Sequence, residues 1–354
     1  MKIIVGMSGG VDSAVSALLL KEQGHDVTGV FMKNWQDADE KFCSAEEDFE
    51  DVRQICNQLD VPYYTFNFEN EYWDHVFELF LDAFKKGYTP NPDILCNKEI
   101  KFKFFLKKAI ASGAEKIATG HYARIRETQD GTFQLLKGVD ANKDQSYFLC
   151  LLNQEALSKT LFPIGDLPKD EVRTLAKKQN LKVHDKKDST GICFIGERKF
   201  NDFLSQFLPA QKGQIIDTDG NVLGEHNGTM YYTIGQRKGI SIGGPGEPLF
   251  VVDKDVTKNL VIVGRGFNHP ALFHQKLVAT DFHWILEEPK AAGWKGTAKI
   301  RYRQADEVIT LVKVADDQWH FEFDQPQRAV TLGQQIVLYE GDVCLGGGVI
   351  VGRG

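Results

Sequence analysis

Two of the six cysteines in this 354-residue chain have surroundings that suit chemistry. Cys96 lies in TPNPDILCNKEIKF, directly before an expected helix, and Cys193 lies in KKDSTGICFIGER, close to lysine and arginine side chains. A helix N-terminus or a nearby cation lowers the pKa of a thiol, and the thiolate is a nucleophile that can also carry a persulfide. Both are therefore candidate reactive thiols, although the same local context also fits two unrelated loop cysteines.

The other cysteines, at positions 43, 56, 150 and 344, form no C-x-x-C pair. Cys56, Cys150 and Cys344 lie in apolar stretches, so we expect them to be small buried side chains. Cys43 precedes a helix cap and fits either role. Scattered cysteines of this kind indicate thiols rather than a disulfide framework, and the lack of short ligand spacing argues against a zinc site.

A glycine-rich string, SGGVDS at residues 8–13, offers a second kind of chemistry. It follows a β-branched run at residues 2–6 and precedes apolar residues at helical spacing. Glycines at such a turn let backbone N–H groups converge beside a helix N-terminus, and that arrangement binds phosphate. The string has no Walker A lysine and does not match the dinucleotide fingerprint G-x-G-x-x-G. We therefore predict a phosphate-binding loop of another type.

The first half of the chain alternates expected strands and helices around these residues. Strands are predicted at 2–6, 26–33, 61–68 and 116–125, with helices between them that include one after the capping box of Ser44 and Glu47 and one at 71–86. This order predicts a parallel sheet with helices on both faces and ligands at the carboxyl ends of the strands. Gly6, Met32 and Gly120 lie at such ends, so one pocket could collect them.

The predicted secondary structure is different in the second half of the chain. Residues 140–210 are predicted to be mainly helical, and Pro209 marks a break. Short strands with glycine turns are then predicted at 213–226, 229–240, 249–255 and 260–266, followed by a second run of strands at 276–354. We therefore expect an α/β chain: a parallel-sheet domain at 1–208, a small central β domain at 209–267 and a C-terminal β-barrel at 268–354.

Charge and hydropathy limit the possible partners. With 42 Lys and Arg against 49 Asp and Glu, the net charge is -7, which argues against a wholly basic coat for nucleic acid. Local basic stretches at 98–108, 235–239 and 301–303 could still contact phosphate, although each alone also fits a solvated surface. No apolar run approaches the ~18 to 20 residues of a membrane span, and no signal peptide is evident, so we expect a cytoplasmic protein that binds no membrane.

The string SGGVDS resembles the pyrophosphate loop of the ATP pyrophosphatase (PP-loop) superfamily, whose members cleave ATP between its α and β phosphates and adenylate a substrate oxygen. Further strings, in chain order, resemble the tRNA-specific 2-thiouridylases of bacteria: NPDILCNKEIKF, ATGHYAR, KDQSYFL, DSTGICFIG and TIGQRKG. The resemblance implies a PP-loop domain, a small central β domain and a C-terminal barrel. It also implies ATP-dependent 2-thiolation of the wobble uridine of tRNA.

The resemblance assigns roles to individual residues. ATP would be bound by Gly6, Met7, Ser8, Gly9, Gly10, Val11, Asp12, Ser13, Met32 and Gly120, with Asp12 also binding a magnesium ion. The target base would be received by Asn91, Pro92 and Asp93, and the catalytic groups would be Cys96, Cys193 and Asp93. The tRNA would also be contacted by His121, Lys143, Asp144, Gln145, Tyr302, Arg303 and Gln334.

These residue types suit the implied reaction. Adenylation turns the 2-carbonyl oxygen of uridine into AMP, which leaves readily. Sulfur then arrives either by direct attack of a persulfide on Cys193 or as sulfide that Cys96 releases from that persulfide. Both routes end in a Cys96–Cys193 disulfide that a reductant must reopen. The base must leave its stack, which costs least in a single-stranded loop. The resemblance suggests tRNAs for Lys, Glu and Gln, and a cysteine desulfurase or a sulfur-carrier relay as donor.

Other functions remain open at this stage. An amidotransferase-type synthetase with a PP-loop would need an ammonia source and would give the paired cysteines no role. A tRNA thiolase acting on another base through an iron–sulfur cluster would need clustered cysteines. An RNA-binding protein that uses ATP only as a ligand would bind tRNA without releasing AMP.

Overall fold

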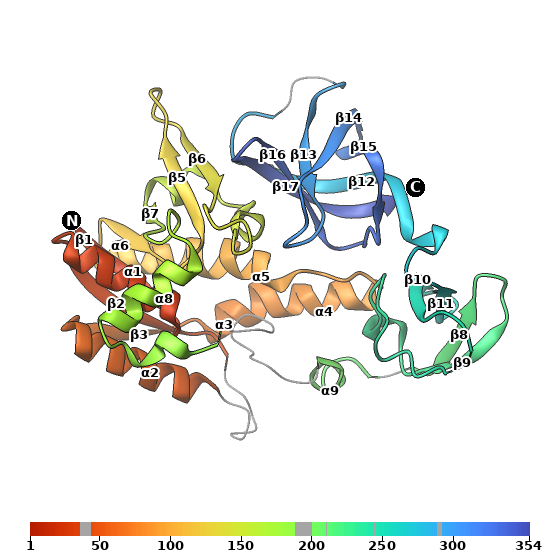
Figure 1. Ribbon diagram of the computed structural model, residues 1–354, viewed down its shortest axis with the longest axis horizontal. Coiled ribbons are helices and arrows are strands. Elements are labelled where there is room, and N and C mark those ends of the chain that lie inside the picture. The colour runs from red at the N-terminus through yellow and green to blue at the C-terminus, as the bar shows by residue number, and fades with distance from the viewer. Residues whose placement is uncertain (36–43, 188–199, 210, 244, 289–291) are drawn as a thin grey trace.

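A computed structural model describes the chain except for residues 36–43, 188–199, 210, 244 and 289–291 (Figure 1). The described strands form a five-stranded parallel sheet, a four-stranded sheet, and a barrel of six strands that is extended by a two-stranded hairpin. This confirms the predicted α/β class with a small β domain and a C-terminal barrel. Cys43 and Cys193 lie outside the described residues.

The parallel sheet has the strand order β3-β2-β1-β4-β7. Its strands are β1 (Lys2–Met7), β2 (Asp26–Lys33), β3 (Tyr63–Asn67), β4 (Lys116–Ala118) and β7 (Thr160–Leu161). The central strands β1 and β2 are almost continuously apolar because helices cover both faces of the sheet. Residues from both faces therefore pack into two hydrophobic clusters, one on each side.

Helices α1 (Val11–Glu22), α2 (Ser44–Leu59) and α8 (Lys169–Lys178) pack on one face of this sheet (Figure 1). The other face is covered by two composite helices. The first runs through α3 (Glu69–Tyr72), the π-helical η2 (Trp73–Phe77) and α4 (Glu78–Lys85), which confirms the helix predicted at 71–86. The second runs through α5 (Pro92–Leu95), the π-helical η3 (Cys96–Phe105) and α6 (Leu106–Ala111). π-Helical turns often occur at functional sites.

The predicted strand at 116–125 is wrong in one respect, because it is two strands. After β4 the chain turns at residues 119–122 and continues as β5 (Ala123–Glu127), which pairs with β6 (Phe133–Lys137). Gly120 allows the turn to lie directly on α1: a Cβ there would stand 2.7 Å from the carbonyl carbon of Asp12. The β5–β6 hairpin then leaves the parallel sheet and pairs with the barrel, Leu135 opposite Cys344.

Between β6 and the small domain, the structure describes short helical segments in addition to α8. They are η4 (Ser146–Leu149), α7 (Gln154–Ser158), η5 (Lys182–Asp185) and α9 (Phe200–Leu204). The small domain has the strand order β10-β11-β8-β9, formed by β8 (Gly213–Asp217), β9 (Val222–His226), β10 (Leu249–Asp255) and β11 (Leu260–Arg265). The predicted strand at 229–240 is wrong: after the 3-10 turn η6 (Thr229–Tyr231), Gly235 and Gly239 both have φ +83°, which turns the backbone out of an extended path.

The barrel has the strand order β12-β15-β14-β13-β16-β17, and β12 closes it by pairing with β17. Its strands are β12 (Phe273–Trp284), β13 (Lys295–Lys299), β14 (Glu307–Ala315), β15 (Gln318–Arg328), β16 (Gln335–Glu340) and β17 (Val343–Arg353), and η7 (Pro270–Leu272) precedes them. Inward-facing residues such as Leu277, Ile309 and Phe321 fill its interior. Among the described helices, none is long and apolar enough to cross a bilayer.

Candidate functional site

The glycine-rich loop lies where strand β1 ends and helix α1 begins. Gly9 has φ +74°, and a Cβ there would stand 2.6 Å from the main-chain oxygen of Asp48, so only glycine fits. The hydroxyl of Ser13 accepts from the Ser8 N–H and donates to the Gly10 oxygen, both at 3.2 Å. Gly10 is the N-cap of α1 and provides no side chain to cap it. A helix N-terminus whose backbone N–H groups have no side-chain cap favours an anionic ligand.

The residues predicted to bind the nucleotide meet at this edge of the sheet. A Cβ on Gly6 would lie 3.2 Å from Cε of Met32, so these two predicted residues are in contact. Gly120 lies against the first turn of α1, where a Cβ would also stand 2.7 Å from the Ser13 nitrogen. The carboxyl ends of β1, β2 and β4 therefore bring Gly6, Met32 and Gly120 to one place, as the strand order requires.

Asp12 has partners that the sequence pattern does not reveal. Nζ of Lys169, the first residue of α8, donates to both carboxylate oxygens of Asp12 at 2.8 Å. The hydroxyl of Tyr122 donates to Asp12 Oδ1 at 2.7 Å. The Lys169 side chain is 8% exposed and that of Asp12 is 30% exposed. In sequence, Lys169 looks like any polar residue at a helix start, so no local signal identifies it.

A magnesium ion fits this arrangement in one respect. Among the described residues, no group of three or more His, Cys, Asp or Glu side chains could hold a metal by itself. Magnesium bound with a nucleotide needs only one or two carboxylates, because phosphates and water complete its coordination. Asp12 is a partly exposed carboxylate beside the phosphate loop, and it already attracts a cation in the form of the Lys169 ammonium.

A second lysine, Lys186, contacts the other end of the loop. Its Nζ donates to the Gly9 oxygen at 3.2 Å, to Asp48 at 2.8 Å and to Asp51 at 2.6 Å. Burial by itself would lower the pKa of Lys186, but the hydrogen bonds to the two aspartates outweigh it and raise the pKa. Lys186 therefore links the chain that follows η5 to the phosphate loop.

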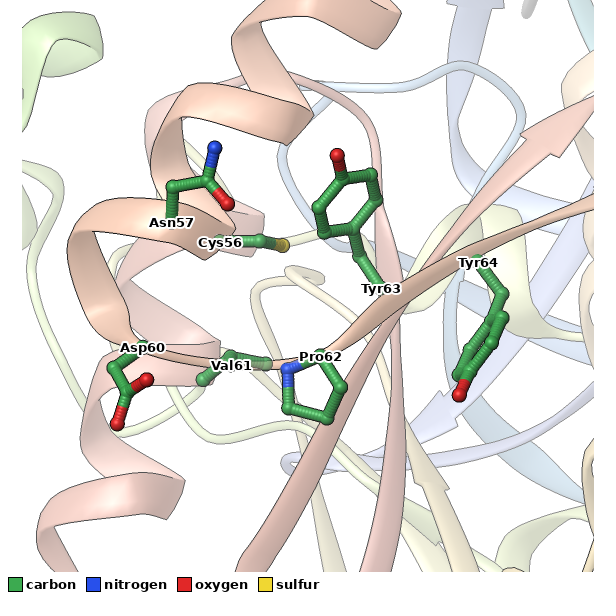
Figure 2. A pocket seen from close by; sticks show the side chains of 7 residues that line it. All are labelled: Cys56, Asn57, Asp60, Val61, Pro62, Tyr63 and Tyr64. Carbon is green, nitrogen blue, oxygen red and sulfur yellow. The ribbon is translucent and has the colours of Figure 1, made fainter.

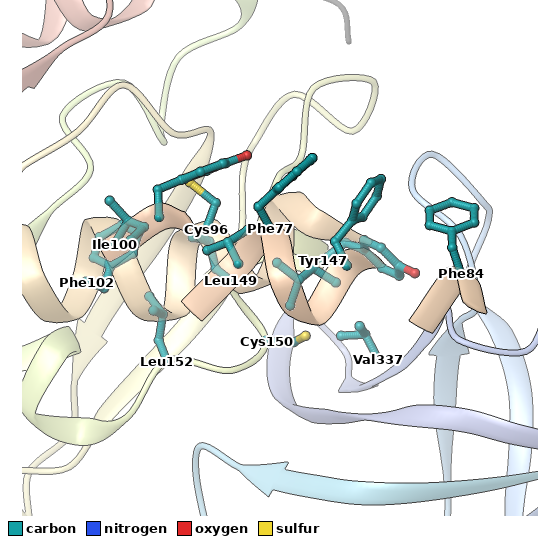
Figure 3. Packing of buried hydrophobic residues seen from close by; sticks show 14 of the residues in the cluster. Phe77, Phe84, Cys96, Ile100, Phe102, Tyr147, Leu149, Cys150, Leu152 and Val337 are labelled. Carbon is teal, nitrogen blue, oxygen red and sulfur yellow. The ribbon is translucent and has the colours of Figure 1, made fainter. Parts of the chain in front are cut away.

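Cys96 lies in the helix rather than before it. The side chain of Asn91 accepts from the Asp93 N–H at 3.1 Å and caps α5, which therefore begins at Pro92 and continues into η3 at Cys96. The Cys96 side chain is 0% exposed and belongs to the same buried cluster as Ile100 and Leu149 (Figure 3). A substrate base could reach this thiol only after the surrounding side chains move.

The barrel approaches this helix through residues predicted to contact tRNA. The Gln334 side chain donates to the Thr89 oxygen at 2.6 Å, just before Asn91, the N-cap of α5. The rings of Tyr302 and Phe148 lie 4.5 Å apart, and the Phe148 oxygen accepts from the Asn97 side chain. Arg303, next to Tyr302, is exposed. The structure thus brings Gln334 and, through Phe148, Tyr302 to the segment that contains Cys96.

The remaining predicted tRNA residues are held by internal contacts. Burial, and then the charge of Lys101, keep the pKa of His121 well below its usual value, and its ring packs against those of Phe102 and Phe162. The buried Asp144 carboxylate accepts from the Ser146 N–H at 3.0 Å and from Lys299 of the barrel at 3.3 Å. Gln145 accepts from the Tyr122 N–H, and Lys143 is half-buried. Their contact with tRNA stays a prediction.

A surface pocket of about 470 Å³ lies elsewhere, lined by Cys56, Asn57, Asp60, Val61, Pro62, Tyr63 and Tyr64 (Figure 2). It borders the start of β3, an edge strand of the parallel sheet. Burial raises the pKa of Cys56 to about 11 and that of Cys344 to about 12. Cys56, Cys150 and Cys344 are all buried, as predicted, and an inert packing role follows for them.

The sequence matches three known domain families in chain order. Their descriptions are tRNA methyl transferase HUP domain at 1–197, tRNA methyl transferase PRC-barrel domain at 201–265 and Aminomethyltransferase beta-barrel domain at 274–350. The protein called tRNA-specific 2-thiouridylase MnmA from Shouchella clausii is 57% identical over 350 residues, which cover 99% of this chain and 96% of that protein. The protein of the same name from Bacillus velezensis is also 57% identical, covering 99% of this chain and 94% of its own.

Solved structures show a more distant likeness. The U34-tRNA thiolase NcsA from Methanococcus maripaludis is 18% identical, with a TM-score of 0.37, and the match covers 58% of this chain and 64% of that one. This likeness is too low to bear on function. The full-length relatives, by contrast, match the phosphate loop, the helix with Cys96 and the barrel within one alignment.

Proposed function

This chain belongs to the family of tRNA-specific 2-thiouridylases, and from that premise we propose that it replaces the 2-oxygen of the wobble uridine in tRNA with sulfur, using ATP. The structural observation that carries this proposal is the placement of η3. Its last residue, Phe105, lies 3.5 Å from a Cβ built on Gly6 of strand β1. Its second residue, Asn97, contacts Phe148 beside the barrel residue Tyr302. One helix therefore joins the nucleotide edge to the predicted RNA surface.

The first chemical step would occur at the nucleotide edge. The 2-oxygen of uridine attacks the α-phosphorus of ATP, and pyrophosphate leaves with the electron pair of the broken bond. Gly9, Gly10 and the first turn of α1 would hold the phosphates, while Gly6, Met32 and Gly120 would border the nucleoside. A magnesium ion bound by Asp12 and the phosphates would neutralise negative charge in this step. The missing Walker A lysine suits a loop that transfers no γ-phosphoryl group.

The second step would use the two cysteines. In one route the terminal sulfur of a Cys193 persulfide attacks C2 of the adenylated base, and AMP leaves. The Cys96 thiolate then attacks the Cys193 sulfur, which releases the thiolated base and forms the Cys96–Cys193 disulfide. In the other route Cys96 first displaces sulfide from the persulfide, and sulfide attacks C2. Both routes leave the same disulfide, which a two-electron reductant must reopen.

The proposal includes partners and roles that follow from the family. The substrates would be tRNAs for Lys, Glu and Gln, and a cysteine desulfurase or a sulfur-carrier relay would load Cys193. Asn91, Pro92 and Asp93 would receive the flipped base, with Asp93 beside the reacting oxygen. His121, Lys143, Asp144, Gln145, Tyr302, Arg303 and Gln334 would contact tRNA, and the work would take place in the cytoplasm. The expected domain limits, 1–208, 209–267 and 268–354, are part of this proposal.

A single reaction tests the proposed function. The protein is mixed with unmodified tRNA, Mg-ATP, a cysteine desulfurase, cysteine and reductant. The tRNA is then digested, and the mass of the wobble nucleoside is measured by mass spectrometry. We expect the oxygen-to-sulfur mass change in the wild type and in the control Cys56→Ala, and its loss in Cys96→Ser and Cys193→Ser. A methyl mass change with S-adenosylmethionine, as the descriptions of the matching domains would suggest, would overturn the proposal. Tight tRNA binding with no AMP release would also overturn it.

A further inference from the structure

The phosphate loop has no basic residue of its own. Residues 3–20, from strand β1 through most of α1, contain neither lysine nor arginine. Phosphate sites usually combine backbone N–H groups with a cationic side chain, because charge-assisted hydrogen bonds are the stronger ones. A nucleotide bound here needs a cation from elsewhere in the fold.

Two lysines from distant parts of the chain reach the loop, and their surroundings differ. Lys186 lies between two carboxylates, those of Asp48 and Asp51, which together exceed its charge. Lys169 donates to the Asp12 carboxylate, which we expect to bind magnesium when the nucleotide binds. Lys186 is thus neutralised by Asp48 and Asp51, for which we expect no other ligand. Asp12, which Lys169 contacts, is by contrast expected to bind magnesium.

Lys169 is also held in place by its surroundings. Its backbone N–H donates to Asp140 at 3.0 Å, which fixes the start of α8. Its Nζ lies 5.6 Å from the centre of the Tyr122 ring, and Tyr122 donates to the same carboxylate. Asp12 is in the first turn of α1, so the ammonium is hydrogen-bonded to a side chain of the helix end that would face the phosphates.

We propose that Lys169 is a phosphate-binding residue of the nucleotide site, held on Asp12 in the free protein and transferred to the phosphates of ATP when ATP binds. The proposal rests on the proposed function, because it takes ATP as the ligand. In a Walker A loop the positive charge comes from a lysine of the loop itself. Here Lys169 supplies it from helix α8. Tyr122 keeps the Asp12 carboxylate in place during the exchange.

Equilibrium binding tests this role without using catalysis. The affinities of ATP and of adenosine are measured by calorimetry for wild type, Lys169→Met, Lys169→Arg and the control Lys178→Met, an exposed lysine of the same helix. We expect Lys169→Met to weaken ATP binding by about 10- to 100-fold and to leave adenosine binding unchanged, because one charge-assisted bond is lost. Lys169→Arg should recover part of the loss, and Lys178→Met should bind ATP like the wild type.

A purely structural role makes different predictions. If Lys169 only neutralises Asp12, then Asp12→Asn should make Lys169→Met harmless, and the double variant should bind ATP as Asp12→Asn does. Under our proposal the double variant loses further ATP affinity, and thermal unfolding of this charge-matched variant checks that it folds. Equal losses for ATP and adenosine, or ATP binding by Lys169→Met at wild-type strength, would overturn the proposal. If the wild type itself fails to bind ATP, the proposed function fails instead.

Discussion

The side-chain amide of Gln334 donates a hydrogen bond to the main-chain oxygen of Thr89 across 2.6 Å. Gln334 belongs to the turn before barrel strand β16, and Thr89 begins the loop that leads to Asn91, Asp93 and Cys96. The neighbouring Gly333 has φ +89°, and a Cβ there would stand 2.7 Å from Cβ of Tyr88. The barrel therefore rests directly on the loop that would receive the base, so a tRNA docked on the barrel could influence that loop.

The Gln334 contact predicts a defect specific to tRNA. In Gln334→Ala the Thr89 oxygen loses its donor, and we expect kcat/KM for tRNA to fall by up to about tenfold, the value of one hydrogen bond. Binding of ATP should not change, because the nucleotide edge is formed by other elements. Steady-state thiolation and ATP calorimetry measure the two effects. Gln318→Ala, at the exposed start of barrel strand β15, is the control. Equal losses for tRNA and ATP would contradict a local role.

The burial of Cys96 predicts slow chemical labelling in the free protein. A local opening that costs only about 1.4 kcal/mol already slows alkylation tenfold relative to a free thiol. We expect iodoacetamide to label Cys96 slowly, and unmodified tRNA to accelerate this labelling if the bound base opens the cluster around Ile100 and Leu149. Peptide mass spectrometry locates the label, and buried Cys56 serves as the internal control. Fast labelling without tRNA would show that the thiol is already accessible.

Much of the architecture could be predicted because it depends on local patterns. The β-branched run at 2–6, the helical spacing after Asp12 and the strings around Cys96 all lie within short segments, and the structure forms the strand and both helices. The start of α5 was harder to predict. Its cap is Asn91, before a proline, and the sequence pattern placed the helix after Cys96 rather than from Pro92 onward.

The features that escaped prediction depend on contacts between distant residues. Lys169 reaches Asp12 across 157 positions, and no residue near either one signals the pair. The β5–β6 hairpin joins the barrel through Leu135 and Cys344, a pairing that local alternation cannot specify. The contact between Asp144 and Lys299 of the barrel is also not signalled by the sequence, and the contact of Asp144 with tRNA stays a prediction. Such positions are determined by how the domains pack, so only the fold reveals them.

The buried pair of Asp144 and Lys299 predicts a large cost when one member is removed. The side chains are 3% and 11% exposed, and they join the nucleotide-binding half to the barrel. Lys299→Met leaves the Asp144 charge without its cation, so we expect a loss of about 3 kcal/mol in the free energy of unfolding. Denaturant titration measures it, with the exposed Lys313→Met as control. The double variant with Asp144→Asn should recover most of the loss; failure to recover would argue that Lys299 acts through other contacts.

The buried imidazole of His121 predicts a pH dependence of stability. Burial, then the charge of Lys101, hold its pKa well below the ordinary value in the folded protein, while the unfolded chain titrates near pH ~6.5. Below that pH the unfolded state binds a proton that the folded state refuses. Stability is therefore retained above pH ~6.5 and falls by up to about 1.4 kcal/mol per pH unit as pH drops toward the folded pKa.

His121→Gln should flatten this fall relative to the wild type. Denaturant titrations between neutral and mildly acidic pH measure the slope for both proteins. The hydrogen bond of 2.8 Å between Thr119 Oγ1 and His121 Nδ1 fits a neutral ring, since either atom can then donate. A slope that is identical in His121→Gln and in the wild type would mean that burial does not lower the pKa of the imidazole, because the folded and unfolded chains would then bind its proton equally.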